Sequence, residues 1–205
     1  MGATSVTNAQ NLFKAKGGRV RAENVRDPRD FYRTPSACVI AILRSESNLF
    51  AAQTVWDPAA GDGAMTQPAL AMGYRVIASD LVRRDNDPTK LIKSVYDFDA
   101  PPAENCAVLM NPPFSEISPR KGGAPFLEHL FKIGIRNIVM LAPIGWGRAV
   151  RRQPLIEQHT PSRCWQLTWR PDWTGGGSSP MDMAFWVWTG EGGPAELKWL
   201  NKPDV

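Results

Sequence analysis

The sequence predicts an α/β fold with a mostly parallel sheet and helices on both faces. Strand-like and helix-like patterns alternate along the chain, as they do where helices connect parallel strands. The run Cys106–Met110 is apolar throughout, which is typical of a strand covered on both faces. The chain has 205 residues, 43% hydrophobic and 21% charged, which suits one folded domain and excludes wholesale disorder.

The alternation begins at Ser36, where a helix is expected that ends before Phe50. A second helix is expected at Ala64–Met72, ended by Gly73, and a third at Pro125–Ile133. Short β-rich runs predict the first five strands at Thr54–Trp56, Tyr74–Ala78, Lys90–Val95, Cys106–Met110 and Ile138–Leu141. Arg163–Trp169 and Ala184–Trp188 flank a turn-rich segment and predict an antiparallel pair.

The rest of the chain suggests a simple organisation. Residues 1–30 lack apolar periodicity and predict a flexible basic arm, which leaves residues 31–205 as a single domain. The three cysteines lie far apart and there are two histidines, so neither a disulfide framework nor a metal site is indicated. No apolar run approaches the roughly 18 residues that cross a bilayer, and we expect a soluble, cytoplasmic protein.

Positive charge is concentrated in two segments. Residues 1–35 hold seven basic and three acidic side chains, and residues 116–152 hold seven and two. Such segments suit a polyphosphate partner, because neutralised phosphates release counterions. A solvated basic surface has the same composition, so charge alone leaves both interpretations open. The candidate phosphate contacts are Arg120, Lys121, Arg148, Arg151 and Arg152.

Polar or glycine-rich elements follow the first four predicted strands. They are the turn Asp57–Gly63, then Asp80, then Asp97, and finally Asn111–Phe114. Ligands of open α/β sheets bind beyond the carboxyl ends of the strands, so these elements predict a binding site. Each of them alone is also compatible with an ordinary turn.

The glycine turn favours a nucleoside over a nucleotide. It lacks GxGxxG, since Thr66 stands where the third glycine would be, and it lacks the Gly-Lys-Ser/Thr of a phosphate loop. Asp80 follows Asp57 by 23 residues, a spacing at which a carboxylate can accept hydrogen bonds from ribose hydroxyls. Adenosine without phosphates fits these features best.

Asn111-Pro112-Pro113-Phe114 is the most informative motif. Two prolines stiffen the backbone, so that the Asn111 side-chain carbonyl and the Pro112 backbone carbonyl can face one amine substrate. Phe114 offers a flat ring on which a base can stack. The motif therefore predicts recognition of a planar amine.

Together the glycine turn and Asn111–Phe114 resemble the S-adenosylmethionine-dependent amino-methyltransferases, most closely the DNA adenine-N6 methyltransferases. Phe31–Pro35 looks like the aromatic-x-Thr-Pro element of that family, and the order of the three elements is similar to its gamma arrangement. The segment from Arg170 to Trp188 looks like the end of small phage-type members. The resemblance covers about residues 31–188. It implies a Rossmann-like class I methyltransferase fold with a seven-stranded sheet.

The resemblance also implies a role for each matching residue. The cofactor S-adenosylmethionine would contact Tyr32, Thr34 and Pro35 and the turn residues Asp57, Pro58, Ala59, Gly61 and Gly63. Asp80 would hold the ribose, while Leu81, Asp97 and Phe98 would contact the adenine ring. Asn111 and Pro112, stiffened by Pro113, would bind the target amine, and Phe114 would stack on the target base.

Only 91 residues follow Phe114, too few for a separate target-recognition domain. Base readout would then come from loops or from the basic arm, with low or short sequence specificity. Trp173, beside three glycines, is a candidate surface contact, whereas Trp186 and Trp188 share one strand face and are expected in the core.

Three functions remain open at this point. A DNA adenine methyltransferase is the leading one, and the basic segments favour a nucleic-acid substrate over a protein. A methyltransferase acting on RNA bases or on protein glutamine would use the same amine-binding motif. A catalytically inactive nucleic-acid-binding relative is the third, and the retention of Asp57, Gly61, Asp80, Asn111 and Phe114 weighs against it.

Overall fold

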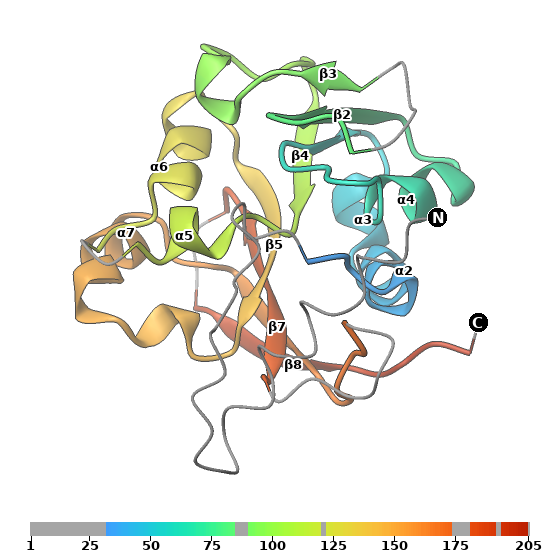
Figure 1. Ribbon diagram of the computed structural model, residues 1–205. Coiled ribbons are helices and arrows are strands. Elements are labelled where there is room, and N and C mark those ends of the chain that lie inside the picture. Colours follow the sequence, from blue (N-terminus) through green and yellow to red (C-terminus); the bar gives the residue numbers. More distant parts are fainter. Residues whose placement is uncertain (1–31, 85–89, 120–121, 174–180, 192–193, 205) are drawn as a thin grey trace, which may run out of the picture.

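The architecture is a mixed sheet with helices packed on both faces (Figure 1). The computed structural model describes residues 32–84, 90–119, 122–173, 181–191 and 194–204. Within these residues the sheet has eight strands. The predicted basic arm, residues 1–30, lies outside the described residues.

The strands and helices alternate through the first two thirds of the chain, as predicted. The strands are β1 (Thr54–Asp57), β2 (Val76–Asp80), β3 (Leu91–Ile92), β4 (Cys106–Met110), β5 (Asn137–Pro143), β6 (Arg163–Leu167), β7 (Met183–Thr189) and β8 (Glu196–Leu200). The helices are α2 (Ser36–Ser45), α3 (Ser47–Phe50), α4 (Thr66–Ala71), α5 (Phe114–Ile117), α6 (Pro125–Lys132) and α7 (Gln153–Gln158). Single 3₁₀ turns occupy Val95–Asp97, Trp146–Arg148 and Val150–Arg152.

The sheet order is β3-β2-β1-β4-β5-β7-β6-β8. Neighbours from β3 through to β5 are parallel, whereas β7 is antiparallel to both β5 and β6. Strand order reverses between β1 and β4, the point at which open α/β sheets bind ligands. The carboxyl ends of both strands therefore meet where the sequence places its polar elements.

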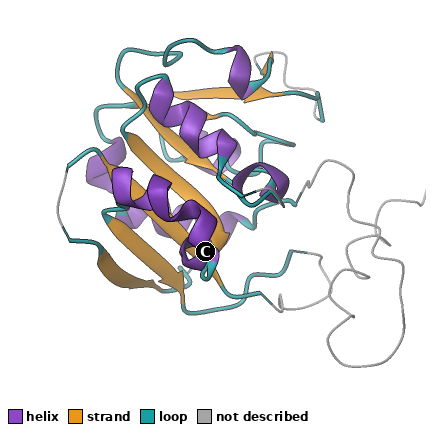
Figure 2. Ribbon diagram, turned by 90° about the vertical axis from the view of Figure 1, so that its left-hand side faces the viewer, coloured by secondary structure: helices purple, strands orange, loops and turns teal. Residues whose placement is uncertain are grey.

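Alternate strand residues bury their side chains on opposite faces. Trp56, Val108 and Met140 join the core beneath α5 and α6, whereas Val55, Leu109 and Val139 join the core beneath α2 and α4. Figure 1 shows α2, α3 and α4 on one side of the sheet and α5, α6 and α7 on the other, and Figure 2 views the second layer face on. Both faces of the central strands are thus buried, which explains why β4 is apolar throughout.

Helix boundaries follow the expected local signals. Gly73, with φ +86°, ends the turn after α4 as predicted, since a left-handed residue lets the backbone leave the helix. Pro125 occupies the first turn of α6, where its missing N–H is not required. The predicted apolar stripe of α6 is buried. Trp186 and Trp188 pack on the same core, which confirms their expected placement.

Two expectations at the sheet edges are wrong. The sheet has eight strands rather than seven, because β8 pairs in parallel with β6. The third strand is limited to Leu91–Ile92 and is followed by a 3₁₀ turn. β3 has two residues and both edge strands are largely exposed, so their hydrophobic pattern is weak. Among the described residues, no helix combines the length and apolar character needed to cross a bilayer.

Candidate active site

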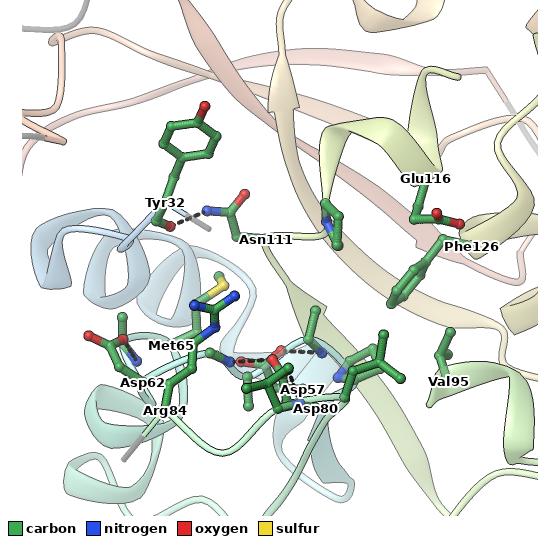
Figure 3. Close-up of a pocket in the computed structure, with 18 of the residues that line it drawn as sticks. Tyr32, Asp57, Asp62, Met65, Asp80, Arg84, Val95, Asn111, Glu116 and Phe126 are labelled. Carbon is green, nitrogen blue, oxygen red and sulfur yellow. Dashed lines mark hydrogen bonds between the residues drawn. The ribbon is translucent and has the colours of Figure 1, made fainter. Parts of the chain in front are cut away.

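A cavity of about 470 Å³ opens at the carboxyl ends of β1, β2 and β4. It is lined by the segment before α2, the glycine turn after β1, the residues after β2 and β3, and the Asn111 motif (Figure 3). These segments are far apart in sequence and are brought together by parallel strands that all end at the same rim. The volume suits a small molecule of drug or cofactor size.

Asp80, the last residue of β2, fastens the glycine turn to the neighbouring strand. Its Oδ2 accepts a hydrogen bond from the Gly61 amide at 2.8 Å, and its Oδ1 accepts one from the Val82 amide at 2.9 Å. Gly61 has φ +58°, a conformation in which a side chain is disfavoured. A carboxylate has further lone pairs beyond these two bonds, so Asp80 can still accept from a ligand in the cavity.

Asp57 and Lys90 are two buried charges beneath the turn, each 2% exposed. The Asp57 carboxylate accepts from the Ala59 amide at 3.1 Å. Burial raises the pKa of Asp57 to about 7, with nearby Asp80 adding to the rise, while the Ala59 bond and Lys90 oppose it. Lys90 Nζ donates to the Gly61 carbonyl at 2.6 Å. The turn is therefore held by two buried side chains, one bonded to its Ala59 amide and one to its Gly61 carbonyl.

Asn111, directly after β4, has its amide orientation fixed by the segment before α2. Its Nδ2 donates to the Tyr32 carbonyl at 3.0 Å and to Thr34 Oγ1 at 3.1 Å. Thr34 is 4% exposed, so this acceptor is held inside the protein. Because the amide nitrogen is occupied by two acceptors, Oδ1 is the atom that remains to accept from a ligand (Figure 3).

The rest of the motif has a mixed placement. Pro113 lines the cavity, whereas Pro112 is buried and does not. Phe114 is half-buried between the two cores, and its ring stacks on that of Tyr32 with centroids 6.1 Å apart. The predicted stacking of Phe114 on a target base stays a prediction.

Most residues expected at the cofactor line the cavity. Tyr32, Asp57, Pro58, Ala59, Gly61, Asp80 and Leu81 all do so. Thr34 reaches the site through Asn111, and Pro35 precedes α2. Gly63, with φ +85°, shapes the turn behind the cavity wall.

Asp97 and Phe98 lie elsewhere than expected. Asp97 Oδ2 accepts from the Ser94 amide at 3.0 Å and so caps its own 3₁₀ turn. Phe98 is 7% exposed and packs on Trp56 with ring centroids 4.8 Å apart. Ser94, Val95 and Tyr96 line the cavity in their place. In so short a turn, residues one or two positions apart face different sides, so the residues that line the cavity come just before those that were expected.

The basic residues expected at a nucleic acid divide into three groups. Arg120 and Lys121 lie outside the described residues. Arg148 and Arg151 are exposed. Arg152 is 9% exposed and donates to the Trp146 carbonyl at 2.8 Å and to Ser118 Oγ at 2.9 Å, so its expected place on a surface groove is wrong. Trp173 is half-buried against the core beneath α2 rather than on an open surface.

Several cavity residues are absent from the sequence expectations. Among them are Arg33, which pairs with Asp62 at 2.9 Å, together with Met65, Arg84, Glu116 and Phe126. Lys90, buried below the cavity, was expected only as the start of a strand. Arg33 and Glu116 adjoin the recognised motifs, which is a signal that could have found them. Phe126 and Lys90 reach the site only through the tertiary fold.

The sequence matches no family model and no curated protein. Its fold is similar to that of a proposed RNA methyltransferase from Pyrococcus horikoshii, with a TM-score of 0.57 and 17% identity over 78% of this chain and 88% of that one. It is also similar to a proposed class I S-adenosylmethionine-dependent methyltransferase from Listeria monocytogenes, with a TM-score of 0.56, 13% identity, and coverage of 82% of this chain and 65% of that one.

A third similar structure is the modification subunit of a proposed type I restriction enzyme from Vibrio vulnificus. The TM-score is 0.53 and the identity 13%, over 82% of this chain and 46% of the subunit. This chain thus spans less than two thirds of the Listeria protein and less than half of the Vibrio subunit. The likenesses show that the fold is the Rossmann-like fold of class I methyltransferases.

Proposed function

We propose that this chain transfers a methyl group from S-adenosylmethionine to the exocyclic N6 amine of adenine in DNA. The observation that carries the proposal is the orientation of Asn111, whose Nδ2 is bonded to Tyr32 and Thr34 and whose Oδ1 is left as an acceptor at the cavity. An acceptor fixed in this way selects a donor, which an amine is and a carbonyl is not.

The cavity residues fit the cofactor. Asp80 has acceptor capacity for the ribose hydroxyls, and Gly61 allows close approach to the backbone. When bound, S-adenosylmethionine supplies an electrophilic methyl group, and the amine lone pair displaces the sulfur while an N–H proton leaves to water. The glycine turn and the Asn111 motif lie on either side of one cavity, so methyl carbon and amine nitrogen would be aligned there.

Asn111 would act on the amine in two ways. By accepting from one N–H, the Asn111 side chain orients the nitrogen. The same hydrogen bond raises the electron density on a nitrogen whose lone pair is otherwise delocalised into the ring. A base in duplex DNA must first leave the stack, and Phe114 with Tyr32 offers an aromatic surface that offsets part of that cost.

Nucleic acid is the substrate class that the chain favours. Arg84 lies at the cavity, and Arg148 and Arg151 are exposed. Two of the similar structures are described as a proposed RNA methyltransferase and as the modification subunit of a proposed type I restriction enzyme, which supports a nucleic-acid substrate without choosing between RNA and DNA. Low sequence specificity would follow if residues 31–205 form a single catalytic domain that reads bases only through its loops.

The experiment supplies methyl-labelled S-adenosylmethionine with DNA, RNA or protein as separate acceptors and hydrolyses the products. Label in N6-methyl-2′-deoxyadenosine from DNA is expected. Label from RNA alone would overturn the choice of DNA but leave the proposed methyl transfer to an amine standing. Label in protein glutamine would overturn the nucleic-acid substrate. No transfer to any acceptor would contradict the proposal that the chain is a methyltransferase.

Replacing Asn111 with alanine tests the acceptor directly. Asn111→Ala should lower kcat about a hundredfold, as does loss of one positioned transition-state hydrogen bond. Affinity for S-adenosylhomocysteine, measured calorimetrically, should stay within about twofold, because the cofactor contacts are retained. Asn137→Ala, at the opposite end of the sheet, is the control and should leave kcat unchanged. Unchanged turnover in Asn111→Ala would remove this residue from the mechanism.

A further inference from the structure

One end of the cavity contains a hydrogen-bonded pair, Tyr96 and Glu116, for which neither the motifs nor the resemblance assigns a role. Figure 3 shows Asp62 and Arg84 toward one end and Val95, Glu116 and Phe126 toward the other. Tyr96 and Pro113 also line the cavity. Apolar side chains and aromatic rings at this end of the cavity suit a flat heterocycle.

Glu116 and Tyr96 are joined across this end of the cavity. The Tyr96 hydroxyl donates to Glu116 Oε2 at 2.5 Å, linking the turn after β3 to the first turn of α5. Burial and the adjacent carboxylate raise the pKa of Tyr96, so the hydroxyl keeps the proton that it donates. A carboxylate held in this way is an acceptor only, and Oε1 retains its acceptor capacity.

The carboxylate that the resemblance would place here is engaged elsewhere. Asp97 accepts from the Ser94 amide in the cap of its own turn and does not line the cavity. A purine ring with a 6-amino group presents two N–H donors at its edge. Glu116 is the acidic side chain at this end that is positioned to accept one of them.

We propose that Glu116, held by Tyr96, accepts a hydrogen bond from the 6-amino group of the cofactor's purine and thereby selects adenine over a 6-oxo purine. The inference rests on the proposed function, since it takes S-adenosylmethionine as the cavity's ligand. Val95, Phe126 and Pro113 form the apolar surroundings of the ring, and Asp80 fixes the ribose at the middle of the cavity. A 6-oxo group would instead place its oxygen against the carboxylate, with no proton between them.

The test compares the binding of two ligands, S-adenosylhomocysteine and S-inosylhomocysteine, by calorimetry. The native chain should bind the inosyl compound at least about tenfold more weakly, as expected for loss of a charged hydrogen bond. Glu116→Gln should reduce this ratio to about three or less, because a glutamine amide can donate to the 6-oxo group. Tyr96→Phe should reduce the ratio by a smaller factor, since the carboxylate loses its tether.

The ratio separates recognition from folding, because a distorted cavity weakens both ligands alike. Glu104→Gln, which removes a carboxylate outside this cavity, is the matched control and should keep the native ratio. An unchanged ratio in Glu116→Gln, whether or not methyl transfer falls, would overturn the assignment and leave the proposed function standing. Failure of the native chain to bind S-adenosylhomocysteine would instead overturn the proposed function.

Discussion

Two buried carboxylates of the molecule, Glu46 and Asp57, differ in how many hydrogen-bond donors surround them. Glu46, between α2 and α3, is 5% exposed and accepts from Arg163 Nε at 2.7 Å, Arg163 Nη2 at 2.8 Å and Trp165 Nε1 at 2.6 Å. Asp57, at the end of β1, is 2% exposed and accepts from one backbone amide, with Lys90 as the nearby positive charge. The first carboxylate is satisfied by its partners; the second keeps a pKa raised by burial.

The two carboxylates lie in different halves of the sheet, and we infer that these halves have different roles. Glu46 ties α2 to β6 in the antiparallel half, where long ladders and aromatic side chains form the core. Asp57 and Lys90 lie under the glycine turn in the parallel half, at the cavity. Removing one partner of a buried charge pair destabilises a fold, whereas a buried carboxyl with few partners and a raised pKa is typical of a functional site.

Breaking the Glu46 pair should have the largest effect on folding. Glu46→Leu leaves Arg163 without its carboxylate, and the free energy of unfolding should fall by about 3 kcal/mol. Urea unfolding followed by tryptophan fluorescence measures this. Affinity for S-adenosylhomocysteine in the folded variant should stay within about twofold.

The double variant Glu46→Leu with Arg163→Leu is the control for this loss. Replacing both members by apolar groups should restore part of the stability, because no unpaired charge remains. A loss below about 1 kcal/mol in the single variant would mean that the pair is as weak as an exposed one, and the contrast with Asp57 would fail.

How far the sequence predicts the fold depends on periodicity. The buried strand Cys106–Met110 and the apolar stripe of Pro125–Lys132 were predicted closely, because burial imposes a pattern on neighbouring residues. The two edge strands were predicted poorly or not at all. Glu196–Leu200 carries charges and exposed side chains, and its pairing with β6 joins segments distant in sequence.

The candidate site divides in the same way. Asn111 and Asp80 were predicted because each directly follows a recognisable strand, and strand ends meet at one rim. Lys90 and Phe126 could not be predicted, because no local pattern states where a long side chain or a distant helix will reach. Arg152 was misplaced for the converse reason, since a charged residue in a basic segment has no local mark of burial.

Lys90→Met tests the role of the buried charge beneath the glycine turn, next to Asp57. It removes the bond to the Gly61 carbonyl and the positive charge that lowers the pKa of Asp57, so the Kd of S-adenosylhomocysteine should rise about tenfold, as for one lost charged hydrogen bond. KM for S-adenosylmethionine should rise with it, while kcat stays within about twofold because Asn111 is untouched.

The matched control is Lys93→Met, a nearby lysine whose Nζ lies over the Phe98 ring at 4.1 Å. It should leave the Kd unchanged. If both variants bind equally well, the lysine under the turn has no part in shaping the cavity, and Asp57 alone would distinguish the two halves.

The last expected effect is a pH dependence of stability that comes from Asp57. The pKa of its carboxyl is about 7 in the folded chain against an ordinary value of 3.8, so between these values the folded state binds a proton that the unfolded state releases. This contribution favours the folded state at low pH and is lost as the pH rises through 7. Relative to Asp57→Asn, the native free energy of unfolding should therefore fall between pH 5 and 7, by at most about 1.4 kcal/mol per unit. Asp182→Asn, at an exposed position, gives the background, and a difference curve as flat as that control would show that Asp57 is compensated as fully as Glu46.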